Sequence, residues 1–191
     1  MEENKISYHV IGFIHSPHKS IEGIPIQPVG AKFIKAEIEL FKEFREGLKD
    51  LDGFSHIIVL YDFHKSKDFK LEVKPFLDNE SHGVFATRAP KRPNSIGLSV
   101  LKLNKIVNNI LYVENVDILD GTPVLDIKPF VSKFDFVDEE RNGWLEKNVD
   151  RSGIKKSDNR FRWLEYNSYK TRLLFCVEVV DGFLVLAPAI Y

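Results

Sequence analysis

The segment between Gly83 and Leu98 carries the residue types that are best suited to chemistry. Three cations, Arg88, Lys91 and Arg92, fall within five positions and are interleaved with prolines. Proline fixes the backbone angle φ and removes N–H donors, so we expect this loop to be stiff. A stiff loop with two arginines suits the binding of carboxylate or phosphate, because the planar guanidinium makes paired hydrogen bonds. A solvated surface turn whose arginines pair with nearby acids explains the pattern equally well.

A second unusual segment, Asp117 to Phe130, contains a tight turn. Gly121 tolerates a strained backbone there, and the side chain of Asp120 can cap the turn. The residues alone favour a plain β-turn. The alternative is that Asp120 and the turn backbone surround the hydroxyl or amino groups of a ligand.

Two further candidates are isolated residues. His64 follows an apolar run at 54–63, and the end of a strand is a common ligand position, although a lone histidine is more often structural. Gln27 lies in a long loop, and its amide offers two donors and an acceptor that suit a purine edge. On these grounds alone, an exposed loop amide is the more common outcome.

Other kinds of site are missing from the sequence. The glycines never take the spacing of a Rossmann or P-loop nucleotide site, and no nucleophile elbow occurs. Cys176 is the single cysteine and the histidines form no H-E-x-x-H, so we expect no metal. The sequence shows no membrane span and no apolar signal core, which predicts a cytoplasmic protein. The net charge of -1 means that any RNA contact must use local patches.

Hydrophobic patterning predicts mostly strands to position these residues. Period-two alternation and short apolar runs indicate strands at 7–14, 32–40, 54–63, 83–87, 98–107, 110–116 and 124–131. Asn108-Asn109 tolerates positive φ and predicts a tight hairpin. Helical spacing predicts one amphipathic helix, which carries Phe41, Phe44, Leu48 and Leu51.

These elements favour a mainly β fold: a small closed or nearly closed β-barrel with one or two short helices. Closure is the natural way to remove exposed sheet edges. Residues 1–135 are expected to form the barrel domain, and 136–191 a C-terminal extension. Its first part is expected to be mostly loop, with a helical turn near Trp144. The extension ends in a β-hairpin at 171–188 around Asp181-Gly182, and its packing on the barrel is an open alternative.

Taken together, these segments resemble the YaeB/TsaA-like family of tRNA adenine-N6 methyltransferases. Two stretches, GVFATRAPKRPNSIGLS and LDGTPVLDIKP, are long and irregular, so chance similarity is improbable. The likeness covers about residues 7–135 in the right order. Phe130 departs from the family pattern, which has tyrosine there. The matching stretches are Ile11–Pro17, Pro25–Gln27, Gly47–His56, Gly83–Ser99 and Leu119–Phe130.

The resemblance implies S-adenosylmethionine as methyl donor and N6-threonylcarbamoyladenosine at position 37 of the tRNA anticodon loop as acceptor. It also implies a homodimer. Lys91 and Arg92 are expected to meet tRNA, and His64 and Asp126 are candidates for the general base, with water as a third. The implied cofactor site consists of Pro25, Ile26, Gln27, His64, Lys65, Arg88, Leu98, Ile118, Leu119, Asp120 and Gly121.

Within that site we hypothesise that Arg88 pairs with the methionine carboxylate and that Leu98 and Ile118 form apolar walls. Asp120 and its turn would hold ribose hydroxyls or the purine edge. The alternative function is a non-catalytic β-barrel module that binds an adenine nucleotide or RNA. A further alternative is methylation of another adenosine-like small molecule.

Overall fold

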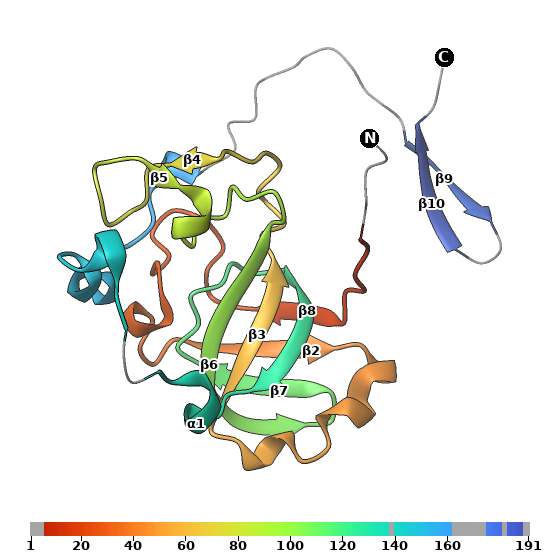
Figure 1. Ribbon diagram of the computed structural model, residues 1–191. Helices are drawn as coiled ribbons and strands as arrows, with labels where there is room; N and C mark the ends of the chain where they lie inside the picture. Colours follow the sequence, from red (N-terminus) through yellow and green to blue (C-terminus); the bar gives the residue numbers. More distant parts are fainter. Residues whose placement is uncertain (1–5, 138–139, 162–174, 181–182, 189–191) are drawn as a thin grey trace.

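Six antiparallel strands close into a barrel, in the order β1-β2-β7-β6-β3-β8 (Figure 1). The computed structural model describes residues 6–137, 140–161, 175–180 and 183–188. The strand bounds are Gly12–His15 (β1), Lys35–Leu40 (β2), His56–Asp62 (β3), Ile96–Val107 (β6), Ile110–Glu114 (β7) and Thr122–Pro129 (β8). The predicted mainly β fold with a closed barrel is confirmed.

Side chains fill the interior of the barrel. Successive residues of a strand point to opposite faces, so one face of each strand enters the core. In β2 the inward set is Ala36, Ile38 and Leu40, and in β3 it includes Ile57 and Val59. With its centre packed, the barrel is not a channel, and a ligand site must lie at one of its ends.

Three long connections leave the same end of the barrel, which we call the mouth. They span residues 16–34, 63–95 and 115–121. Strand register brings them together, because Asp62 at the end of β3 pairs with Ile96 at the start of β6. All segments that the sequence singled out as candidates for binding therefore start or end at the mouth.

The predicted hairpin is confirmed, whereas two other elements differ from expectation. Val107 pairs with Ile110 across the Asn108-Asn109 turn, and Asn108 has a φ of 57°. The expected amphipathic helix is instead two 3-10 segments, Lys42–Leu48 and Leu51–Gly53. Asp50, with a φ of 64°, separates them because a left-handed residue cannot continue a right-handed helix.

The strand expected at 83–87 is also wrong for most of its length. His82–Gly83 (β5) pairs with Glu72–Val73 (β4), and the chain then turns into a 3-10 segment, Val84–Ala86. Burial of Val84 in a small second cluster and hydrogen bonds to its carbonyl favour the turn. The first barrel strand begins later than predicted, at Gly12.

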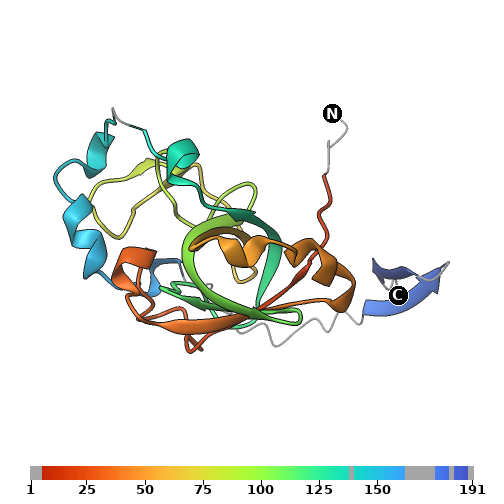
Figure 2. The same ribbon diagram turned by 90° about the horizontal axis from the view of Figure 1, so that it is seen from below.

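The segment after the barrel is mostly loop and has a helical turn at Trp144, as predicted, together with other short helical segments. It contains the helical turn Ser132–Asp135 (α1) and 3-10 segments at Gly143–Leu145, Val149–Gly153 and Asn159–Phe161. Residues 140–161 lie beside the barrel in both views (Figures 1 and 2).

The terminal hairpin consists of Phe175–Val180 (β9) and Phe183–Pro188 (β10), which pair with each other. Its predicted Asp181-Gly182 turn and residues 171–174 lie outside the described residues. In the described part of the chain, no helix combines the length and apolarity that a bilayer crossing requires.

Candidate functional site

A cavity of about 360 Å³ opens at the mouth of the barrel. Small-molecule sites typically measure roughly 300–1,000 Å³ and combine apolar walls with a few polar groups. The apolar part of this wall comes from Ile24, Ile26, Phe63, Leu98 and Ile118. We call it the mouth cavity.

The mouth cavity brings together most of the residues proposed for the cofactor. These residues are far apart in the sequence. They meet in the structure because the three mouth connections lie at the same end of the barrel. The proposed residues that line the mouth cavity are Pro25, Ile26, Gln27, His64, Lys65, Arg88, Leu98, Ile118 and Leu119.

Asp120 and Gly121 lie outside this lining. The carboxylate of Asp120 accepts a hydrogen bond from the backbone N–H of Ser16 at 3.0 Å and pairs with Lys19 at 2.7 Å. The hydrogen bond from Lys19 is the main cause that lowers the pKa of Asp120. Gly121, with a φ of 72°, donates its N–H to the carbonyl of Ile14. In this structure the turn joins the first loop to the barrel.

Arg88 and Lys65 are the exposed cations of the cavity wall, and Arg88 is the one held by Gln27. Nη1 of Arg88 donates to Oε1 of Gln27 at 3.1 Å, although 61 residues separate the two in sequence. The contact holds one nitrogen of the guanidinium in place. The other N–H groups of Arg88 can donate to a carboxylate. Gln27 and Arg88, both proposed from the sequence, therefore act as a unit.

Asp117 also lines the mouth cavity, and it begins a chain of polar side chains that leads to the buried residues Ser99 and Tyr61. Ser99 donates its hydroxyl to Oδ1 of Asp117 at 2.7 Å, and the Tyr61 hydroxyl lies 3.2 Å from that of Ser99. Burial raises the pKa of Asp117 to about 6, against the opposing effects of the Ser99 hydrogen bond and the Arg88 charge. Burial is also the main cause that raises the pKa of Tyr61.

Sequence reasoning missed this chain of side chains. Asp117 lies between the apolar residues Val116 and Ile118, so an acid with apolar neighbours was the available signal. Tyr61 looked like an ordinary core residue of a buried strand. Its ring packs over Gly97, where an added Cβ would overlap the ring atoms. Glycine is therefore required beside Tyr61.

The two candidates for the general base occupy different places. His64 lines the mouth cavity, and burial, followed by the charge of Lys65, lowers its pKa. Its imidazole is therefore neutral near pH 7 and has a nitrogen free to accept a proton. Asp126 lies outside the lining on β8, where it pairs with Lys128 at 2.6 Å.

The two cations proposed for RNA contact also differ. Arg92 lines the mouth cavity, and its Nη1 donates to the carbonyls of Val84 at 3.1 Å and Thr87 at 2.8 Å. These bonds hold the loop in its turned conformation. Lys91 lies outside the lining. In the described part of the chain, no group of three or more His, Cys, Asp or Glu side chains could hold a metal ion.

Residues 13–136 match the family model of the tRNA-methyltransferase O N-terminal domain. The chain belongs to the tRNA-methyltransferase O family. Phe130, where that family was expected to have tyrosine, packs edge-on against His56 at the end of the barrel opposite the mouth. This difference from the expected family sequence therefore lies away from the mouth cavity.

Two named relatives of this family member show how far the similarity extends. A probable S-adenosyl-L-methionine-binding protein of Pyrococcus abyssi is 53% identical over 162 residues, which cover 85% of this chain and 88% of that protein. The tRNA (adenine(37)-N6)-methyltransferase of Homo sapiens is 34% identical over 71% of this chain and 32% of its own length. The chain thus spans about a third of the human enzyme.

Solved structures of the family share the fold. The crystal structure of TrmO from Pseudomonas aeruginosa superposes with a TM-score of 0.62 at 39% sequence identity. The match covers 73% of this chain and 62% of that one.

Proposed function

We propose that this tRNA-methyltransferase O family member transfers a methyl group from S-adenosylmethionine to N6 of N6-threonylcarbamoyladenosine at position 37 of the tRNA anticodon loop. The observation that carries the proposal is the mouth cavity, in which Arg88, Gln27 and Asp117 surround an apolar chamber. Family membership and the relatives' names support the same reaction.

The chemistry of the cavity wall fits the donor. Arg88 offers N–H groups to the methionine carboxylate, and Asp117 offers negative charge to the ammonium or sulfonium. Ile26, Leu98 and Ile118 provide apolar surface for the adenine ring, whereas we do not assign Asp120 a contact with it. When bound, S-adenosylmethionine supplies a methyl group on a positively charged sulfur.

Positioning is the main contribution that the protein can make to this displacement. Correct orientation of two reactants lowers a barrier by up to roughly 7–11 kcal/mol in ideal cases. The acceptor nitrogen loses one proton when it is methylated, and the neutral imidazole of His64 is suited to accept it. Asp126 is the weaker candidate because it lies outside the cavity and pairs with Lys128.

The wider setting is part of the proposal. A homodimer, cytoplasmic location and contact with the anticodon loop fit a tRNA-modifying enzyme, since unpaired loops offer unstacked bases to proteins. Residues 1–135 would form the donor-binding domain and 136–191 its extension. Lys91 is the better candidate for a phosphate contact, because Arg92 is engaged with backbone carbonyls.

Methyl incorporation from labelled donor tests the function. The substrates are tRNA that carries N6-threonylcarbamoyladenosine, the same tRNA without this modification, and the free nucleoside. We expect label in the modified tRNA alone, with a mass increase of one methyl group in the digested nucleoside. Donor binding without incorporation would instead establish the non-catalytic module, and equal labelling of the free nucleoside would establish a small-molecule methyltransferase.

A further inference from the structure

A second cavity, of about 690 Å³, adjoins the mouth cavity. The Gln27–Arg88 contact belongs to the walls of both, and so does Leu98. The outer wall of the second cavity is made by Asn142, Trp144, Leu145, Val149, Ser152 and Phe161. These residues belong to 140–161, which we call the strap. The strap follows the 13–136 region that matches the family model.

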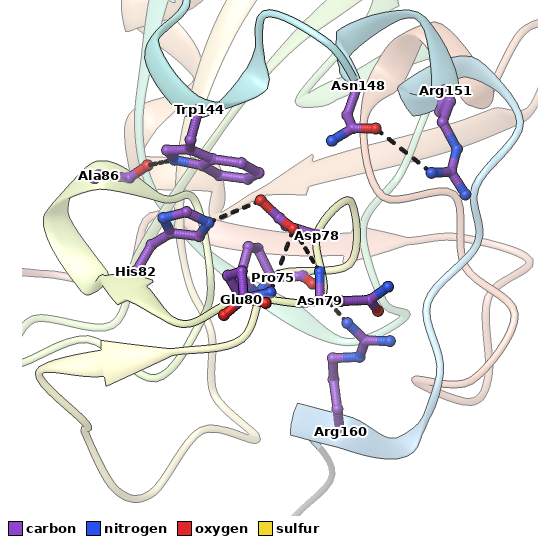
Figure 3. Close-up of polar contacts among 10 residues, drawn as sticks. All are labelled: Pro75, Asp78, Asn79, Glu80, His82, Ala86, Trp144, Asn148, Arg151 and Arg160. Atoms are coloured by element: carbon purple, nitrogen blue, oxygen red, sulfur yellow. Dashed lines mark hydrogen bonds and ion pairs between the residues drawn. The ribbon is translucent and has the colours of Figure 1, made fainter.

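One end of the strap is fixed by Trp144 (Figure 3). Its indole Nε1 donates to the carbonyl of Ala86 at 2.8 Å. Its ring stacks on His82 with centroids 4.4 Å apart and an interplanar angle of 15°. His82 in turn contacts the carboxylate of Asp78 at 3.0 Å. A hydrogen bond and a ring stack thus tie the strap to the 75–86 loop.

The other end of the strap is fixed by Arg160 and Phe161. Arg160 donates to the carbonyl of Pro75 at 2.6 Å, as Figure 3 shows, and its guanidinium lies 5.0 Å from the ring centre of Phe76. Phe161 is buried and meets Phe76 edge-on at 5.1 Å. This end of the strap is anchored by a charged hydrogen bond and by aromatic packing.

Between its ends, the strap is bonded to the first mouth loop. The backbone N–H of Ser157 donates to the carbonyl of Ile24 at 2.8 Å, and the carbonyl of Ser157 accepts a hydrogen bond from the N–H of Gly23 at 3.0 Å. The strap is therefore a fixed wall that contacts both loops around the two cavities.

The lining of the second cavity has a distinct chemistry. Among the described residues that line it, Arg88 is the only charged one, so the cavity favours a ligand with a negative charge. Phe76, Trp144 and Phe85, a residue that is 75% exposed, provide aromatic surface. Unstacked RNA bases are held by aromatic side chains, and a carboxylate is held by arginine.

We propose that the second cavity binds the acceptor nucleoside and that the strap forms its outer wall. This inference rests on the proposed function, since it names where the threonylcarbamoyl-bearing adenine lies. The purine would lie against the aromatic wall, and the threonyl carboxylate would lie toward Arg88. The shared wall puts this chamber beside the mouth cavity, as a reaction between two bound molecules requires.

Val149→Trp tests the inference because Val149 lines the second cavity and not the mouth cavity. The control is Val107→Trp, which makes the same change on β6 outside both linings. The two valines are 38% and 43% exposed, so both positions tolerate a larger side chain. Full-length proteins are titrated with S-adenosylhomocysteine and, when loaded with it, with an anticodon stem-loop that carries N6-threonylcarbamoyladenosine.

For Val149→Trp we expect at least a tenfold rise in the stem-loop dissociation constant and less than a twofold change for S-adenosylhomocysteine. Val107→Trp should change neither constant. Trp144→Phe, which keeps a ring beside His82 and loses the bond to Ala86, should weaken stem-loop binding by a smaller factor.

Unchanged stem-loop binding by Val149→Trp, or equal weakening of both ligands, would overturn the acceptor assignment. A methylation assay of the wild-type protein separates this failure from that of the function. If the wild type methylates the stem-loop, the proposed function stands even when the cavity assignment falls. If the wild type transfers no methyl group, both are overturned.

Discussion

The negative charge of Asp117 lowers the free energy of unfolding of the protein. Burial raises the pKa of its carboxyl from 3.8 to about 6, so the ionised form is disfavoured in the native state. Below pH 3.8 the group is protonated in both folded and unfolded chains, and no penalty arises. The penalty grows as pH rises from there to about 6 and is complete above it.

Asp117→Asn is therefore expected to raise the free energy of unfolding at pH 7.5, on the order of 1 kcal/mol after allowance for partial exposure. Asparagine keeps an oxygen that can accept the Ser99 hydroxyl. The same variant should bind S-adenosylmethionine more weakly, because it loses the negative charge. Denaturant unfolding at pH 7.5 and pH 4 measures the first effect, and the gain should shrink at pH 4. A variant that is less stable than wild type at both pH values would contradict this view of Asp117.

His64 gives a prediction for the pH dependence of catalysis. Burial and the Lys65 charge lower its pKa below 6.5, so the proton-accepting form persists to below that pH. The ratio kcat/KM, which reports groups of the free enzyme, should fall on the acid side with a midpoint below 6.5. His64→Gln should remove this limb and lower kcat by about 100-fold, a typical size for a general base. A pH–rate profile that is identical for both proteins would assign the proton to water instead.

At the scale of elements, the barrel strands could be predicted because apolar and polar residues alternate along them, and this alternation matches the alternation of buried and exposed side chains. Residues 35–40 alternate between apolar and charged, and each apolar member is buried. The single helix predicted over 41–51 is two 3-10 segments in the structure, since four apolar residues at helical spacing do not reveal the left-handed Asp50 that separates them. The 83–87 region has the composition of a strand, but side-chain hydrogen bonds of Thr87 and Arg92 to backbone carbonyls of the same loop turn it, and residue types alone do not reveal these bonds.

In strand β6, the backbone of Gly97 lies directly against the ring of Tyr61. Gly97→Ala should lower the free energy of unfolding by about 1–3 kcal/mol, the usual cost of overpacking, because its Cβ would overlap the Tyr61 ring. The shifted ring would also disturb Ser99 and Asp117, so donor affinity should fall. Gly53→Ala is the control, since nothing lies within 4 Å of its added Cβ. Equal melting temperatures for the two variants would exclude a packing role for Gly97.

At the scale of the whole molecule, the sequence predicted which residues gather at the mouth far better than it predicted their partners. The resemblance named Gln27, Arg88 and Leu98 correctly as neighbours in space, since all three line one cavity. Asp117 was not found because its role depends on the contact between its loop and Ser99 on β6. The strap could be described only as a charged loop, because its anchors, such as Trp144, bond to residues some 58 positions away.

The near-neutral charge of the whole chain limits how it can hold RNA. With a net charge of -1, affinity for tRNA must come from a few local cations. Each phosphate contact to a single strand contributes about 0.7 to the slope of log affinity against log salt. Lys91→Ala should reduce that slope by about this amount. Arg92→Ala should leave the slope unchanged and lower the melting temperature, because its bonds to Val84 and Thr87 are structural. A reduced slope for Arg92→Ala at unchanged stability would reverse these two roles.

The donor site in the mouth cavity is tested most directly by equilibrium titration of S-adenosylhomocysteine into wild type and Arg88→Ala. Arg45→Ala is the control, since Arg45 lies in the 3-10 segment after β2, at the other end of the barrel. Loss of a charged hydrogen bond costs about 1.5–3 kcal/mol, so the dissociation constant of Arg88→Ala should rise roughly 10- to 150-fold. Arg45→Ala should match wild type. Equal dissociation constants for wild type and Arg88→Ala would show that the donor binds elsewhere.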